Sequence, residues 1–485
     1  MSRMETVRDQ ERWPLPKLIY AILMSILLIS YLVIQAFDHE PFALPTTLVL
    51  PMTAAAVLGI WLGRLWRDKG FLLMIALLLF QIIRVAVKGG DLFFSDVVNE
   101  SLINGLWVIG GCYALGRILS AKQLKSFIRT LVAVWTICIT LQCLIALYGA
   151  WTDHEVLNLS GGSCWGIPYA YWQEYIAERL HVGYAYPTVA GSTLSLSGAL
   201  AFGAVLAVRP KWAKVLYGLA FLVIIITLGL TDARASILSL SASVGVLVFS
   251  TVIWLTGRKD QKSAASVPKT RGKQFCRWLI AFVSMIVVFL ISTMVILKAA
   301  PVFNEVKTKG SVCLSSASAE EAEGEWKRKV QSRGLNGMSA LNGRDTVWRE
   351  VINYCTESRK RLLFGESIAD PMAGPNLRLQ TPMSHCHNMI VQILLESGLT
   401  GLLLVICFGA YITIRAFRII KSSIFPLWIK LLPAIPVSVL VGDLAECFGW
   451  FRQWKIPALA FMFVAFGIID AYGDRKVNHQ EEYLA

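Results

Sequence analysis

Long apolar stretches alternate with short polar segments through most of the chain. Continuous apolar runs of about 18 to 25 residues predict membrane-spanning helices, because about 20 residues at 1.5 Å each cross the hydrocarbon core of a bilayer. The runs are too long and too continuous for the alternating strands of a transmembrane β-barrel. They predict about twelve spans, over residues 18–37, 43–62, 70–87, 100–118, 127–149, 187–208, 212–231, 235–256, 276–298, 388–414, 426–444 and 455–472.

The composition agrees with a membrane protein. Of 485 residues, 55% are hydrophobic and 16% are charged, and the mean hydropathy is +0.58. This balance excludes a large water-facing globule and predicts an all-α bundle of transmembrane helices. The net charge of +14 could suit nucleic acid, but the basic residues are scattered among short loops. Membrane topology explains them better, and we expect no nucleic-acid partner.

Basic residues concentrate in alternate short loops, at 64–69, 122–125, 209–214, 257–274 and 415–421. The positive-inside rule therefore predicts that both termini lie in the cytoplasm. The first apolar run lacks a small-residue cleavage site and is typical of an uncleaved signal anchor.

Three regions follow from this topology. Residues 1–298 would form about nine spans with an outer loop at 150–186. Residues 299–387 would form a large, partly helical outer loop, and residues 388–485 would form about three more spans and a cytoplasmic tail.

One apolar segment begins with a polar head that contains two histidines. If residues 384–408 form a helix, a single stripe contains His387, Val391, Leu394, Gly398 and Gly401. The histidine would lie at the membrane surface, and the two glycines below it would let a neighbouring helix approach closely. His387 is therefore the best chemical candidate in the chain.

Metal and disulfide chemistry are weakly indicated. His385 and His387 could both ligate a metal, but no clear carboxylate partner accompanies them, so we expect no metal or other cofactor. The ten cysteines contain no CxxC pair. The sequence leaves a disulfide between Cys313 and Cys355 as an open alternative, because both cysteines would lie on the oxidising side of the membrane.

Three arginines are candidates for anion binding. The apolar run 215–250 is broken only by residues 231–234, so it predicts a tight helical hairpin with Arg234 at the membrane boundary. Arg234 could pair with Asp232 or snorkel, or it could hold a lipid-linked phosphate. Arg344 begins a predicted amphipathic helix of about four turns, and Arg179 precedes the helix that enters at Pro187. A solvated surface arginine is the alternative for Arg344.

These residues together resemble the O-antigen ligase and polymerase superfamily of bacterial membrane glycosyltransferases. The strongest match is the His387-Asn388 pair followed by Gly398 and Gly401. The TDARAS turn around Arg234 is similar to the family's arginine-bearing turn, and NGRDTVW resembles its Gly-Arg segment. The resemblance covers mainly residues 179–410.

The resemblance implies a glycan donor carried on polyprenyl diphosphate, and metal-independent transfer to an acceptor hydroxyl at the periplasmic face of the bacterial inner membrane. The acceptor would be a lipid A core in a ligase or a growing glycan in a polymerase. His387 would be the general base, and Arg234, Arg344 and, more weakly, Arg179 would bind the diphosphate. A transporter of about twelve spans is the alternative from another class, but the sequence has no twofold hydropathy repeat.

Overall fold

The computed structural model describes most of the hydrophobic helices and part of the segments between them. The described residues are 15–37, 46–88, 104–152, 159–164, 167–171, 175–176, 179–184, 186–263, 271–314, 344–366, 372–379, 383, 385–422, 424–445 and 456–473.

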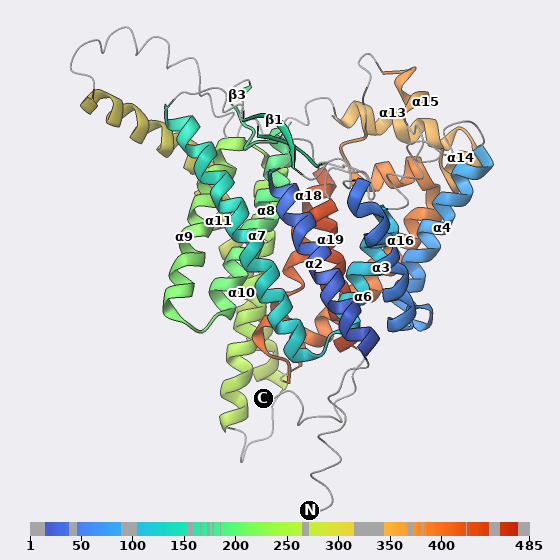
Figure 1. Cartoon of the computed structure of the whole chain (residues 1–485), viewed down its shortest axis with the longest axis horizontal. Coiled ribbons are helices and arrows are strands. Elements are labelled where there is room, and N and C mark those ends of the chain that lie inside the picture. Colours follow the sequence, from blue (N-terminus) through green and yellow to red (C-terminus); the bar gives the residue numbers. More distant parts are fainter. Residues whose placement is uncertain are drawn as a thin grey trace, which may run out of the picture.

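Helices lie in all twelve ranges that the apolar runs predict, and they pack into one bundle (Figure 1). In the first half they are α2 (Leu15–Phe37), α3 (Thr46–Gly63), α4 (Lys69–Lys88), α5 (Asn104–Leu106), the π-helix η5 (Trp107–Cys112), α6 (Tyr113–Ile118) and α7 (Ala121–Thr152). A one-turn 3-10 helix, η2 (Leu65–Arg67), lies between α3 and α4. In the second half they are α8 (Pro187–Ala207), α9 (Lys211–Thr231), α10 (Arg234–Ser263), α11 (Arg271–Leu314), α16 (Met389–Lys421), α17 (Leu427–Leu431), α18 (Ala434–Ala445) and α19 (Ile456–Gly473).

Eight of the described helices are long and apolar enough to cross a membrane. Shorter apolar helices include Leu50–Gly63 and Pro457–Gly473. The expectation of a helical membrane protein is therefore confirmed, whereas the count of about twelve crossings stays a prediction.

The segments outside the apolar helices gather at one end of the bundle (Figure 1). They comprise α13 (Arg344–Thr356), α14 (Arg359–Phe364), α15 (Ala373–Asn376), β1 (Leu159–Cys164), β2 (Ile167–Tyr171), β3 (Tyr175–Ile176) and β4 (Arg179–Leu180). The strands form two antiparallel pairs, β1 with β2 and β3 with β4. The sequence predicted no strand here, because these pairs are too short for a period-2 pattern to stand out. The predicted amphipathic helix is present as α13, with Val347, Val351 and Cys355 buried.

Helix α11 extends beyond the predicted region boundary at residue 298. It contains 44 residues and continues through Pro301. Such a helix is about 66 Å long, roughly twice the thickness of a hydrocarbon core. Hydropathy locates only the part in contact with lipid, so it placed the boundary inside a continuous helix.

Serine hydroxyls join the three helices at the centre of the bundle. Ser195 Oγ of α8 lies 2.7 Å from Ser239 Oγ of α10 and 3.0 Å from Ser438 Oγ of α18. Small hydroxyl side chains let helices approach closely in a membrane, and they satisfy one another's polar atoms. These contacts fix the position of α10 along its axis relative to α18.

A buried charge cluster connects helices at the end of the bundle opposite the outer segments. The Asp470 carboxylate of α19, which is fully buried, pairs with Arg117 of α6 and with Arg415 Nε of α16 at 2.9 Å. Tyr113 and Tyr411 donate to the same carboxylate at 2.8 and 2.6 Å. Arg117 also pairs with Asp68, which precedes α4. Two arginines and two aspartates thus neutralise one another and connect four helices.

We expect Asp470→Asn to destabilise the fold, because it replaces the buried carboxylate that pairs with Arg415 by a neutral group and leaves Arg117 only its pair with Asp68. Removing one partner of a buried ion pair typically costs about 3–5 kcal/mol. The melting temperature of the purified protein in detergent measures this loss. Asp345→Asn is the control, because Asp345 is exposed at the start of α13. Equal melting temperatures for the two variants would contradict the role of the cluster.

Candidate functional site

His387 lies on a tight turn immediately before α16. Its φ angle is 50°, a left-handed conformation that few residues other than glycine adopt. The next residue, Asn388, caps α16: its side-chain oxygen accepts from the backbone nitrogens of Ile390 and Val391 at 2.9 and 3.1 Å. This is the usual way in which asparagine begins a helix. The cap fixes where the helix starts, and therefore where His387 projects.

Two segments hold the turn from opposite directions. The backbone nitrogen of Cys386 donates to Gln392 Oε1 at 2.9 Å, and the Cys386 carbonyl accepts from Trp348 Nε1 of α13 at 2.8 Å. Gln392 in turn donates to Glu396 Oε1 at 2.7 Å. The His387 backbone nitrogen donates to His385 Nδ1 at 3.2 Å. Both polar groups of the Cys386 backbone are therefore used to orient the residue that follows.

The expected straight helix below His387 is wrong, because α16 is kinked at Gly398. This residue has φ 63° and ψ −165°, which no helix contains. That region of backbone space is essentially restricted to glycine. The predicted stripe from His387 to Gly401 therefore does not continue across the kink. Pattern reasoning missed it because glycine inside an apolar run is also common at helix contacts.

The kink is where the outer segments join the membrane helix. A Cβ atom at Gly398 would lie 2.4 Å from the Leu363 carbonyl carbon, and one at Gly365 would lie 2.4 Å from the Glu396 carbonyl carbon. Gly365 has φ 69° and ψ −174°, the same unusual conformation. The two backbones thus pass each other with no room for side chains. The predicted close approach occurs at Gly398, but the neighbour is the end of α14 and not another spanning helix.

Hydrogen bonds complete this junction. The Leu395 carbonyl, three residues before the kink, accepts from Glu366 N at 2.7 Å. Arg84 of α4 donates to the Gly365 carbonyl, and Gln81 of α4 donates to Ser397 Oγ. Backbone groups at such a break need new partners within apolar surroundings. At Gly401 the nearest atoms belong to Ser397 of the same helix, and an added Cβ would also lie 3.8 Å from Leu77 Cδ1 of α4, so a second helix is in contact there.

Arg234 and Arg179 meet at the turn between α9 and α10. Asp232 closes α9 with φ 47°, and Arg234 begins α10 with its Nε 3.9 Å from Asp232 Oδ1. Arg179 Nε donates to the Thr231 carbonyl at 2.8 Å, and its Nη2 donates to the Asp232 carbonyl at 3.2 Å. Arg179 therefore holds the turn from which Arg234 projects. The predicted tight hairpin is confirmed.

Arg344 is linked to the histidine turn through its own helix. It is the first residue of α13, and Trp348 follows one turn later on the same face. Trp348 bonds the carbonyl that precedes His387. The structure therefore places Arg344 on the helix that braces this turn.

A further bond relates the histidine turn to the Arg234 hairpin. Asn388 Nδ2 donates to the Leu444 carbonyl of α18 at 2.9 Å. Ser438, earlier on α18, lies level with Ser239 on α10. Five residues before Ser239, α10 begins at Arg234, and six residues after Ser438 comes Leu444. His387 and Arg234 consequently lie at the same end of the bundle, which we call the His387 end; the opposite end, which contains Asp470, is the Asp470 end.

Several residues that shape this site could not be identified from the sequence pattern. Trp348, Gln392 and Gly365 act through contacts between distant segments, which periodicity does not reveal. Among the described residues, no group of His, Cys, Asp and Glu could hold a metal ion. Cys355 has a free, buried thiol, and burial raises its pKa to about 11. The side chain of Cys313 lies outside the part of the chain that the structure describes, so the predicted pairing is untested.

We expect Gly398→Ala to disrupt the junction, since alanine adopts this backbone conformation at a cost of about 1–3 kcal/mol and its Cβ would contact Leu363. A lower melting temperature in detergent and faster proteolysis between α13 and α16 would report the loss. Gly409→Ala on the same helix is the matched control, because nothing lies within 4 Å of its added Cβ. An unchanged Gly398→Ala protein would show that the kink is dispensable.

The chain was compared with known families and proteins. No curated protein sequence matches it. Residues 219–406 match the family model described as O-Antigen ligase. The matched region contains Arg234, Arg344, His387 and the kink at Gly398, whereas Arg179 lies before it. The resemblance of this multi-pass helical membrane protein to the O-antigen ligase superfamily is thereby confirmed over residues 219–406.

Proposed function

We propose that the chain transfers a glycan from a polyprenyl diphosphate carrier to an acceptor hydroxyl at the His387 end of the bundle. The observation that carries this proposal is the position of His387. It lies within the matched family region, on a turn that three separate segments brace, and at the same end as the Arg234 hairpin. Basic loops concentrate towards the Asp470 end, which favours placing the His387 end on the periplasmic side of the inner membrane.

In this proposal His387 is the general base. Imidazole is the side chain best suited to accept a proton near neutral pH. The acceptor oxygen would attack the anomeric carbon as its proton passes to His387. The bond between that carbon and the diphosphate oxygen would break, and polyprenyl diphosphate would leave. The braced turn supports the role, because general-base catalysis requires an imidazole held within hydrogen-bond reach of the hydroxyl.

The arginines would bind the diphosphate and stabilise the negative charge that grows on it. Guanidinium groups suit phosphate because they present several donors in a planar fork. Arg234 supports this assignment best, since its side chain is one-fifth exposed at the start of α10. Arg344 would approach from α13. Arg179 is the weakest of the three, because carbonyls of the α9–α10 turn already accept from its guanidinium.

The acceptor decides between two activities of the same superfamily. A ligase would transfer finished chains to a lipid A core, and a polymerase would add repeat units to a growing glycan. Either acceptor would approach from the end of the bundle at which α13 and α15 lie (Figure 1). We favour the ligase, because the matched family is described as O-Antigen ligase.

We expect His387→Ala to lower the transfer rate by about a hundredfold to ten-thousandfold, the usual effect of removing a general base. His385→Ala should lower the transfer rate much less, because His385 accepts a hydrogen bond from the His387 backbone and acts only by positioning His387. The measurement is a gene deletion complemented with each variant, with surface and carrier-linked glycans resolved by gel and mass spectrometry. Long chains stranded on the carrier would indicate a ligase, and single repeat units a polymerase. Near-normal glycans with folded His387→Ala protein would refute the assignment.

Arg234→Gln and Arg344→Gln should each raise the KM for the lipid-linked donor by about 10- to 100-fold, because a hydrogen bond to a charged group is worth about 1.5–3 kcal/mol. Steady-state kinetics of the reconstituted protein would measure the change. Arg234→Lys should recover part of the affinity, since it keeps the charge but not the fork. Arg359→Gln is the control, because Arg359 is exposed on α14. A donor KM that matches this control in both variants would rule out diphosphate binding by these arginines.

A further inference from the structure

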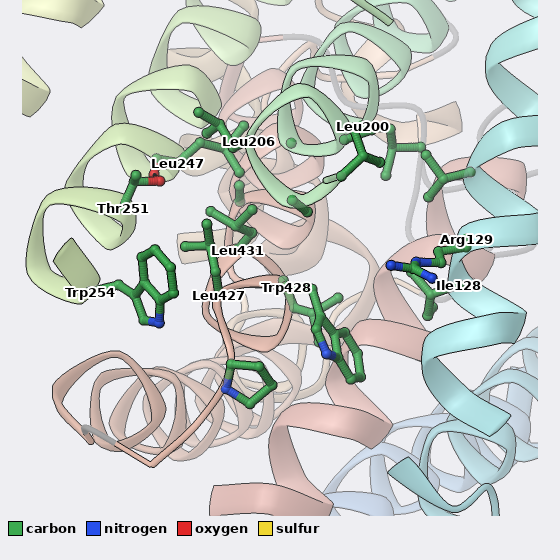
Figure 2. Close-up of a pocket in the computed structure, with 18 of the residues that line it drawn as sticks. Ile128, Arg129, Leu200, Leu206, Leu247, Thr251, Trp254, Leu427, Trp428 and Leu431 are labelled. Carbon is green, nitrogen blue, oxygen red and sulfur yellow. Dashed lines mark hydrogen bonds between the residues drawn. The ribbon is translucent and has the colours of Figure 1, made fainter. Parts of the chain in front are cut away.

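A large cavity lies away from the residues that the proposed reaction uses. It has a volume of about 890 Å³ and is lined mainly by residues of α7, α8, α9, α10, α17 and α18. Figure 2 shows its apolar wall, with Leu200, Leu247 and Leu431 around the space and Trp254 and Trp428 at one side. Its volume falls within the range of about 300–1,000 Å³ that is typical of small-molecule sites. The cavity is therefore large enough to hold part of an amphipathic molecule.

The charged residues of this cavity all have the same sign. Lys125 and Arg129 of α7, Arg209 and Lys214 line it, and the lining residues include no carboxylate. Figure 2 shows the Arg129 guanidinium extending from α7 towards the cavity. Arg129, Arg209 and Lys214 are exposed, so their charges lie at the rim and the apolar wall lies deeper. This arrangement complements an anion with an apolar tail.

The cavity is separate from the proposed donor site. It contacts α10 at Leu247, Thr251 and Trp254. Arg234 begins that helix 17 residues before Thr251, so the two sites are about 26 Å apart along the helix axis. The cavity lies towards the Asp470 end. Tryptophans are enriched where a bilayer meets water, so Trp254 and Trp428 mark the level of the lipid headgroups at this end.

We propose that this cavity binds an anionic phospholipid from the leaflet at the Asp470 end. The phosphate would lie among Arg129, Lys214 and their basic neighbours, and the upper part of the acyl chains would fill the apolar wall. Basic pockets between transmembrane helices are suited to anionic headgroups in this way. A free phosphate would leave the apolar wall of the cavity uncovered. A zwitterionic lipid would place its own positive group near four basic side chains, which would repel it. The inference does not depend on the transfer reaction.

The test is native mass spectrometry of the purified full-length protein with phosphatidylglycerol or phosphatidylcholine. Phosphatidylglycerol should bind at least about tenfold more tightly, because each cation near an anionic lipid contributes on the order of a factor of five. Arg129→Gln/Lys214→Gln should abolish this preference. Lys125→Gln/Arg209→Gln should independently reduce the preference for phosphatidylglycerol. This second variant tests the proposal if the first one does not fold.

The matched control is Lys122→Gln/Lys211→Gln. It removes two charges from the same helices, at exposed positions that do not line the cavity, and it should keep the preference for phosphatidylglycerol. An equal loss in the control would show that general surface charge attracts the lipid, and would overturn the proposal. Equal binding of the two lipids to the wild type would also overturn it. So would displacement of phosphatidylglycerol by an equal concentration of glycerol phosphate.

Discussion

The backbone polar groups beside the kink in α16 need hydrogen-bond partners within apolar surroundings. The geometry of the site depends on which groups supply them. The Leu395 carbonyl, three residues before the kink at Gly398, accepts from Glu366 N at 2.7 Å. Because an unpaired backbone group inside a membrane protein costs several kcal/mol, the break ties the outer segment to the bundle. Gly365 and Gly398 make this approach feasible, since neither backbone could pass the other with a Cβ present. The segment of α16 between His387 and the kink is thereby fixed at both ends, by the Asn388 cap and by this junction.

The two ends of the bundle use charge differently. At the Asp470 end, carboxylates and guanidinium groups neutralise one another inside the protein, so this cluster supports the fold. At the His387 end, Arg234 stays partly exposed, and its Nε lies 3.9 Å from Asp232 Oδ1. A partly solvated guanidinium at a helix start can still exchange its partner for a phosphate. The contrast explains why only some of the arginines near apolar helices are candidates for chemistry.

The sequence predicted whatever depends on local pattern. Apolar length located the helices, the interruption at residues 231–234 located the hairpin around Arg234, and spacing located α13. His387 was predicted at the start of its helix, because a polar head that contains it runs into a long apolar segment. The kink, the contact of Trp348 with Cys386 and the role of Gly365 were not predictable, because each depends on segments far apart in sequence. A glycine in an apolar run has the same appearance whether it allows a helix contact or breaks the helix.

The central claim is that Arg234 on α10 and Arg344 on α13 act on one donor molecule beside His387. A double-mutant cycle on kcat/KM, with Arg234→Gln, Arg344→Gln and the double variant in purified, reconstituted protein, tests it most directly. Residues that share a ligand should show a coupling energy of about 0.5–3 kcal/mol. Losses that add to within about 0.5 kcal/mol would show that the two arginines act independently. That result would contradict a single site at the His387 end.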